Sequence, residues 1–138
     1  MPITDLADLL RSMRPIRQDG EYVFVDAEAL PAEVRVEASV REEEGPSGVI
    51  ARGDADLLGL PYDVVTTWIT LTVHSSLEAV GLTAAVSTAL AEAGLPCNVI
   101  AGLRHDHLLV PTGSADDALR VLQELSARSA HEAADAAG

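Results

Sequence analysis

Apolar positions change their spacing several times along this chain, and each change marks a new element. In the C-terminal half, a stretch rich in Val, Ile and Thr precedes apolar residues spaced three or four apart, and two short apolar runs around a Gly-containing turn come next. These patterns are typical of a buried strand, an amphipathic helix and a β-hairpin. The predicted β-α-β-β unit therefore has its elements at residues 64–73, 80–93, 97–101 and 108–110.

The N-terminal half shows a different order. Apolar residues on one face predict a first helix that Thr4 can cap and that Pro15 stops. Residues 22–25 are apolar on both faces, which indicates a strand inside a sheet, and residues 34–40 alternate as a half-buried strand does. The remaining predicted elements are an acidic turn at 42–48, a short strand at 49–52 and a brief helix that Asp54 caps and Gly59 closes.

A last helix follows the second unit, because Ser114 precedes two acids and an apolar face that ends at Leu125. Residues from Ser126 onward have no apolar face, which predicts a frayed or disordered tail. The chain thus divides into an incomplete unit at 1–63, a second unit at 64–128 and a tail at 129–138. The first unit opens with a helix and the second lacks a final strand, so we expect residues 22–25, from this chain or a second copy, to complete the second unit's edge.

The C-terminal unit resembles an ACT domain. The resemblance rests on Gly81-Leu82, on Val86 and Leu90, and on the helix end at 91–94 with the strand start at 98–100. A wider stretch, covering nearly the whole chain, resembles a group of small bacterial ACT-domain proteins. This resemblance implies an α+β fold of two ACT-like, ferredoxin-like βαββαβ units, with antiparallel sheets and helices packed on one face. It also implies a regulatory protein that binds a small molecule, usually an amino acid.

Gly81 is the most informative single residue, since glycine inside a helix costs about 1 kcal/mol relative to alanine. Either a ligand approaches the backbone at the helix start, where free N–H groups bind carboxylates, or the helix packs closely on a strand. The segment before it also has two interpretations. In one, Ser75 and Glu78 form a capping box; in the other, the helix begins nearer Gly81 and Glu78 faces a cation.

Asp106 is the second acid of interest, because on a strand it shares a face with Leu108 and needs a partner there. The alternative is a turn aspartate that bonds its own hairpin. Arginine sensors of eukaryotic cytosol, built from tandem ACT domains, look similar around both acids. Carried over by position, that resemblance implies that Glu78 and Asp106 face the ligand, with the backbone of residues 79–82 near it and two residues of the next strand beside it. With the two serines before the helix added, the predicted ligand-binding residues are Ser75, Ser76, Glu78, Ala79, Val80, Gly81, Leu82, Asn98, Ile100 and Asp106.

Charge and composition exclude several classes of function. The formal net charge is −13 and every cation is an arginine, which opposes binding to nucleic acid or to anionic membranes. Without an apolar run long enough to span a bilayer, and with acids near its N-terminus, the chain is expected to be cytoplasmic. The single cysteine, Cys97, excludes an internal disulfide and is expected to be a small core residue.

Catalytic and metal chemistry find little support in the sequence. His74, His105 and His107, with Asp106, are chemically sufficient for zinc, but their spacing is not a recognised signature. No nucleophile motif or phosphate loop is present, and the acids at 26–44 are best explained as a solvated face. Trp68, within a strand, is expected to lie in the core or an interface. We therefore predict no catalytic residue, metal or cofactor.

Three classes of function stay open at this point. The first is a non-enzymatic ACT-type sensor, a homodimer that binds an amino acid. The second is a structural or interaction module without a ligand, and the third is a metal-binding protein or a small enzyme on the same fold. A fold alone does not decide among them.

Overall fold

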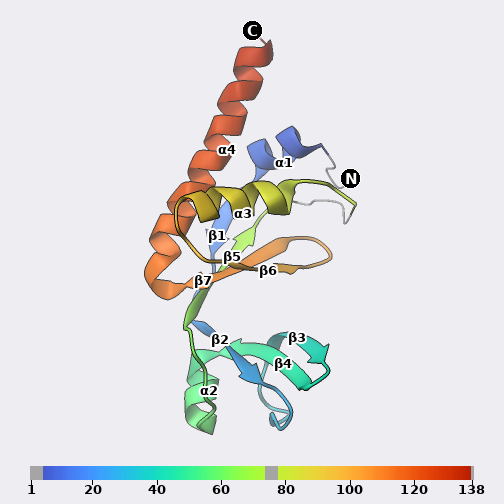
Figure 1. The fold of residues 1–138 in the computed structure, drawn as a ribbon, viewed down its shortest axis with the longest axis vertical. Coiled ribbons are helices and arrows are strands. Elements are labelled where there is room, and N and C mark those ends of the chain that lie inside the picture. The colour runs from blue at the N-terminus through green and yellow to red at the C-terminus, as the bar shows by residue number, and fades with distance from the viewer. Residues whose placement is uncertain (1–4, 74–77, 138) are drawn as a thin grey trace.

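The structure is a computed structural model that describes residues 5–73 and 78–137 (Figure 1). Four strands follow one another between the first two helices, and all strand pairs are antiparallel. In chain order the elements are α1 (Leu6–Ser12), β1 (Pro15–Arg17), β2 (Tyr22–Asp26), β3 (Val36–Glu42), β4 (Gly45–Ala51), α2 (Arg52–Leu58), β5 (Thr66–Leu71), α3 (Leu82–Glu92), β6 (Asn98–Ala101), β7 (Asp106–Pro111), the 3₁₀ turn η1 (Thr112–Ser114) and α4 (Ala115–Ala137).

The strands form one curled sheet in the order β3-β4-β2-β5-β7-β6, and β1 pairs with β5 beside β2. Two overlapping sets of four strands share β5: one is β5-β2-β4-β3, and the other is β1-β5-β7-β6. Helices α1, α3 and α4 cover one face of the second set, and α2 packs on the same face of the first (Figure 1). The predicted α+β class, with antiparallel strands and helices on one face, is confirmed. The opposite face, without helices, is called the open face below.

Strands from the first part of the chain complete the sheet edge of the C-terminal unit. The edge of the C-terminal unit is completed by β1, whose Pro15 lies opposite Leu71, and a proline is tolerated at the first residue of a strand. This strand was not predicted. The predicted donor, β2, pairs mainly with β4 and meets β5 at one residue pair, Tyr22 and Thr66. The Thr66 hydroxyl donates to the Tyr22 carbonyl at 2.7 Å, which fixes this junction.

The larger core lies between α1, α3, α4 and the strands of the C-terminal unit. Leu9 of α1 and Met13, the C-cap of this helix, are fully buried in it, so the packing crosses the predicted division at residue 63. The smaller core holds Val23, Val25 and Ile50 beneath α2. The first part of the chain therefore stabilises the last part.

Several predicted boundaries need correction. Residues 34–40 were expected to form a half-buried strand, but β3 lies at the edge of the sheet, and Val40 is 62% exposed. Helix α2 has Ala51 as its N-cap instead of Asp54, and its end at Gly59 is as predicted, with a φ of 68°. Helix α1 is capped by the Asp5 side chain, which accepts from the Asp8 N–H.

The C-terminal tail is the largest correction. Where the sequence predicted a frayed or disordered segment, α4 continues to Ala137 and projects beyond the rest of the fold (Figure 1). Alanine has the highest helix propensity, and an existing helix is extended at little cost, so the segment needs no apolar face to remain helical. Within the described ranges, no helix is long and apolar enough to cross a membrane.

Candidate functional site

Helix α3 begins at Leu82 and has Gly81 as its N-cap, in agreement with the interpretation that placed the helix start near this glycine. Gly81 has a φ of 102°, a conformation that side chains oppose, and an added Cβ would lie 3.0 Å from Leu6 Cδ2 of α1. The close approach is therefore to α1, where the sequence suggested a strand. Glycine at the N-cap offers no side-chain oxygen to the start of α3, and the first N–H groups of a helix have no acceptor within the helix itself.

Asp106 lies at the start of β7, opposite Leu71 of β5 and Ala101 of β6. Its strand position places it on the helix-covered face together with Leu108, as predicted. Burial raises the pKa of the half-buried Asp106 carboxyl, and the neighbouring His107 and His105 oppose that rise. The hairpin is closed by a backbone bond from the Gly102 N–H to the His105 carbonyl at 2.9 Å, so its closure does not require the carboxylate.

These two features lie at one end of the molecule. The hairpin tip reaches the end of β5, where His105 Nδ1 is 3.4 Å from the Val73 carbonyl oxygen, and Figure 1 shows the start of α3 on the same side as this tip. The helix start and Asp106 together offer N–H donors and a carboxylate, which are complementary to the two charged groups of an amino acid.

The other predicted residues near α3 differ in exposure. Leu82 is buried in the larger core and Ala79 packs against it, so these residues can offer only backbone groups. Val80 is 83% exposed, and Glu78 is exposed as well. Ser75 and Ser76 lie outside the described residues, as does His74.

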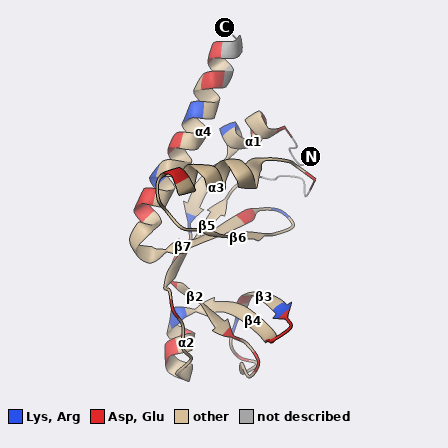
Figure 2. Cartoon of the chain, viewed as in Figure 1, with Lys and Arg blue, Asp and Glu red and all other residues tan. Residues whose placement is uncertain are grey.

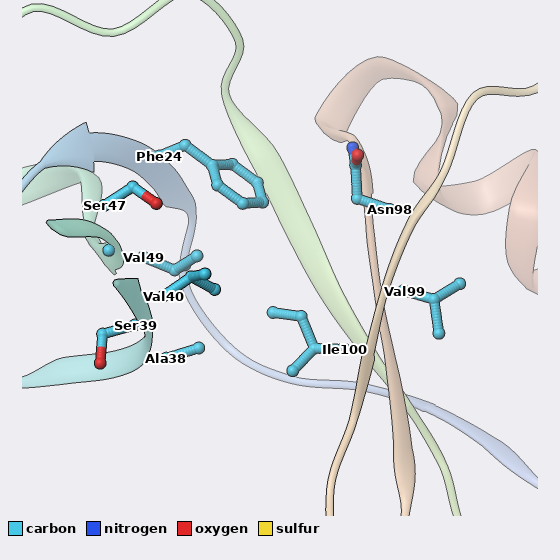
Figure 3. Close-up of a pocket in the computed structure, with 10 residues that line it drawn as sticks. Phe24, Ala38, Ser39, Val40, Ser47, Val49, Asn98, Val99 and Ile100 are labelled. Atoms are coloured by element: carbon cyan, nitrogen blue, oxygen red, sulfur yellow. The ribbon is translucent and has the colours of Figure 1, made fainter. Parts of the chain in front are cut away.

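Asn98 and Ile100 of β6 lie on the other face of the sheet. They pair with Leu109 and His107, and they line a cleft of about 260 Å³ on the open face. Figure 3 shows Ile100 pointing into this cleft toward Val40, while the neighbouring Val99 points away. The structure thus divides the predicted binding residues between two faces of one sheet.

The open face also carries a hydrogen-bonded group of side chains around Trp68. The Trp68 indole N–H donates to His107 Nδ1 at 3.1 Å, and Thr70 Oγ1 lies 3.1 Å from the same nitrogen. Because an indole N–H can only donate, His107 Nδ1 must accept, which requires that nitrogen to be unprotonated. Burial lowers the pKa of His107, with His105 adding to the effect and Asp106 opposing it.

Reactive groups elsewhere give little indication of chemistry. Over residues 5–73 and 78–137, no cluster of three or more His, Cys, Asp or Glu is placed to hold a metal ion. Cys97 packs against the larger core, and burial raises the pKa of its thiol while a hydrogen bond with Ser87 opposes the rise. A raised thiol pKa reduces the thiolate fraction and so the reactivity.

The acidic residues are dispersed over the surface. Figure 2 shows them along α4 and at the turn between β3 and β4, where three exposed glutamates, residues 42–44, follow one another. A solvated run of like charges of this kind is typical of a surface that remains in water.

Two family models match the chain, and both describe an ACT domain. The first matches residues 1–67 and the second residues 63–124, so that together they cover both units. ACT domains are regulatory modules that bind small molecules. Among curated proteins, none matches the sequence.

Solved structures share this fold. A Vibrio cholerae protein of unknown function, described as a possible transport protein, is 43% identical; the match covers 88% of this chain and 95% of that one, with a TM-score of 0.79. An Agrobacterium tumefaciens protein is 17% identical, with coverages of 83% and 89% and a TM-score of 0.69. The regulatory subunit of aspartate kinase from Thermus thermophilus is 9% identical, with coverages of 83% and 96% and a TM-score of 0.61, which shows the shared fold. This chain belongs to the ACT-domain family and carries two ACT domains in tandem.

Proposed function

We propose that this protein is an amino-acid-binding regulatory protein without catalytic activity of its own, acting as a cytoplasmic homodimer. The observation that carries the proposal is the start of α3, where the N-cap is Gly81, a residue without a side chain that could cap the first N–H groups. A carboxylate is the natural acceptor for such a helix start. Asp106, at the same end of the fold, would accept an ammonium or guanidinium group.

The packing of the helices gives the proposal a physical route from ligand binding to regulation. Helix α3 packs against α1, and α1 packs against α4 in the same core. A ligand that contacts the start of α3 would therefore favour one packing of these helices over another, and its differential affinity for the two packings would shift their populations. Strands β3 and β6 end the sheet order, so their outer edges offer a second copy a place to pair.

Thermal unfolding with each proteinogenic amino acid in turn tests this function. A ligand that binds only the folded protein adds about 2.7 kcal/mol of stability at a hundred times its dissociation constant. We expect a rise in Tm confined to one or a few amino acids. Substitution Asp106→Asn should weaken that binding by more than about tenfold, or about 1.4 kcal/mol.

The control for this experiment is Asp19→Asn, which removes an exposed carboxylate elsewhere and should leave the affinity unchanged. Unchanged affinity in Asp106→Asn would remove Asp106 from the site. A Tm that responds to no amino acid would contradict the proposal and favour an interaction module instead.

A further inference from the structure

A second hollow lies on the open face where the two units meet. Its volume is about 350 Å³, within the roughly 300–1,000 Å³ that is typical of small-molecule pockets. Its walls come from the segment between β1 and β2, from the start of β2, from residues 35–37 at the start of β3, and from β5 and β7. It is separate from the start of α3, because α3 covers the opposite face of the sheet.

One wall of this hollow carries a cation and an anion side by side. Arg35 Nε lies 2.9 Å from Glu37 Oε1, and the two side chains are 83% and 25% exposed. An ion pair whose cation is largely exposed to solvent contributes little to the stability of a fold. The two side chains can therefore exchange this ion pair for ion pairs with a ligand that carries one charge of each sign, with little loss of protein stability.

The position of Glu37 depends on an irregularity in β3. The pairing with β4 passes from Val36 opposite Ile50 to Ala38 opposite Val49, so Glu37 is the extra residue of a β-bulge. A bulge changes the direction of a side chain relative to a regular strand, and bulges are frequent beside binding sites. Here the bulge brings a carboxylate to the hollow in an otherwise alternating strand.

The facing wall is aromatic and rigidly held. The rings of Trp68 and Tyr22 meet edge to face with centroids 5.5 Å apart. The Trp68 indole is fixed by its hydrogen bond to His107, and Gln18 Nε2 donates to Thr70 Oγ1 at 3.1 Å on the same side. Aromatic rings whose edges are bonded in this way present their remaining surface to apolar or cationic groups.

We propose that this hollow is a second ligand site, which binds a small zwitterion with an apolar or aromatic side group. The carboxylate of the ligand pairs with Arg35, its ammonium pairs with Glu37, and its side group lies against Trp68 and Tyr22. The two charged residues belong to the N-terminal unit and Trp68 to the C-terminal unit, so a bound ligand joins the two. This proposal goes beyond binding at the start of α3 and does not depend on it.

Trp68 supplies the measurement, because it is the only tryptophan of the chain and lies in the hollow. The probes are L-phenylalanine and L-leucine, with phenethylamine and 3-phenylpropanoate as analogues that keep only one charge. Selective excitation of tryptophan reports on Trp68 alone. We expect a saturable change in emission with at least one of the two zwitterions and affinities at least about tenfold weaker for the analogues, because each lacks one charge-assisted contact.

Variants separate this site from the rest of the surface. Arg35→Gln and Glu37→Gln should each weaken the Trp68 response by about tenfold. The matched controls are Arg41→Gln and Glu42→Gln, which remove the same charges from exposed positions of β3 outside the hollow and should leave it unchanged. Circular dichroism of each variant checks that the fold is retained.

Three results would overturn the proposal. They are a Trp68 emission that neither zwitterion changes saturably, a response that Arg35→Gln and Glu37→Gln both leave intact, and analogues that bind as tightly as the zwitterions. The comparison of zwitterion with analogue uses the unaltered protein, so it stands even if a variant fails to fold. An amino acid that raises Tm while neither probe changes Trp68 emission would support the site at α3 and contradict this one.

Discussion

The two ACT domains of this chain differ in how they bury their sheets. The C-terminal unit packs three helices over its strands, whereas the N-terminal unit has α2, which is seven residues long. Between β2 and β3 the described backbone forms turns instead of a helix, and Leu30 and Val34 cover part of the smaller core. A small domain buries a smaller fraction of its surface and is less stable on its own.

The comparison shows that the two units depend on each other. The N-terminal segment completes the C-terminal unit through α1 and β1, and β5 in turn provides the neighbour of β2. An ACT unit can therefore lose a helix when its sheet continues into a better-covered one. On the open face, residues of both units line one hollow at their junction.

The largest expected effect comes from the segment that crosses between the units. Leu9 of α1 is fully buried in the larger core, so Leu9→Ala should lower the free energy of unfolding by about 2–5 kcal/mol. Urea unfolding followed by circular dichroism measures the change. Native-state hydrogen exchange should locate the weakening in β5 and β7, far along the chain from the substitution.

Ile50→Ala is the matched control, because Ile50 is equally buried in the smaller core. We expect a cost toward the lower end of that range, since a small core can collapse around the lost methyl groups. Its faster hydrogen exchange should be concentrated in β2 and β4. An unchanged stability in Leu9→Ala would contradict the assignment of α1 to the core of the C-terminal unit.

A smaller effect distinguishes the glycines at the two helix starts. Gly81 precedes α3 with a φ of 102°, and Gly53 lies within α2 with open space around it. Gly81→Ala should cost about 1–2 kcal/mol, mainly from the left-handed backbone, because Leu6 is 36% exposed and can move away from the new methyl group. Gly53→Ala should instead stabilise the protein by up to about 1 kcal/mol.

Thermal unfolding of the two variants measures these opposite signs. If Gly81→Ala were neutral, the backbone at the start of α3 could not be constrained as the structure describes. Titration of Gly81→Ala with the amino acid that raises Tm should also show weaker binding, since a methyl group at Gly81 would reduce access to the N–H groups.

The sequence predicted the regular parts of this fold well and the shared parts poorly. Strong periodicity located β5, α3 and the hairpin of β6 and β7, with the end of α3 near Gly94. The sequence analysis missed β1, because a strand of three residues that begins with proline is too short to show an alternation of apolar and polar residues. It also placed residues 34–40 half in the core, because alternation alone does not reveal that a strand lies at an edge.

The candidate sites show the same limit. Gly81 and Asp106 stood out because glycine at a helix start and an acid on an apolar face need a physical reason. Arg35 and Glu37 did not stand out, since they read as the polar side of an alternating strand. Their place beside Trp68 depends on a bulge and on pairing between units, which are long-range features that no local pattern reports.

The smallest effect concerns the charge at Asp106, and its sign depends on pH. Burial raises the pKa of this carboxyl, so the folded protein holds the proton more tightly than the unfolded chain, and stability falls as pH rises through the window between the two pKa values. Asp106→Asn removes the cost of the buried charge and should therefore raise Tm at neutral pH. The advantage should shrink as pH falls through this window and disappear below the ordinary aspartate pKa of about 3.9, where the carboxyl is neutral in both states. Differential scanning calorimetry across this range tests the sign, and a variant less stable than the original protein at neutral pH would mean that a partner already compensates the carboxylate.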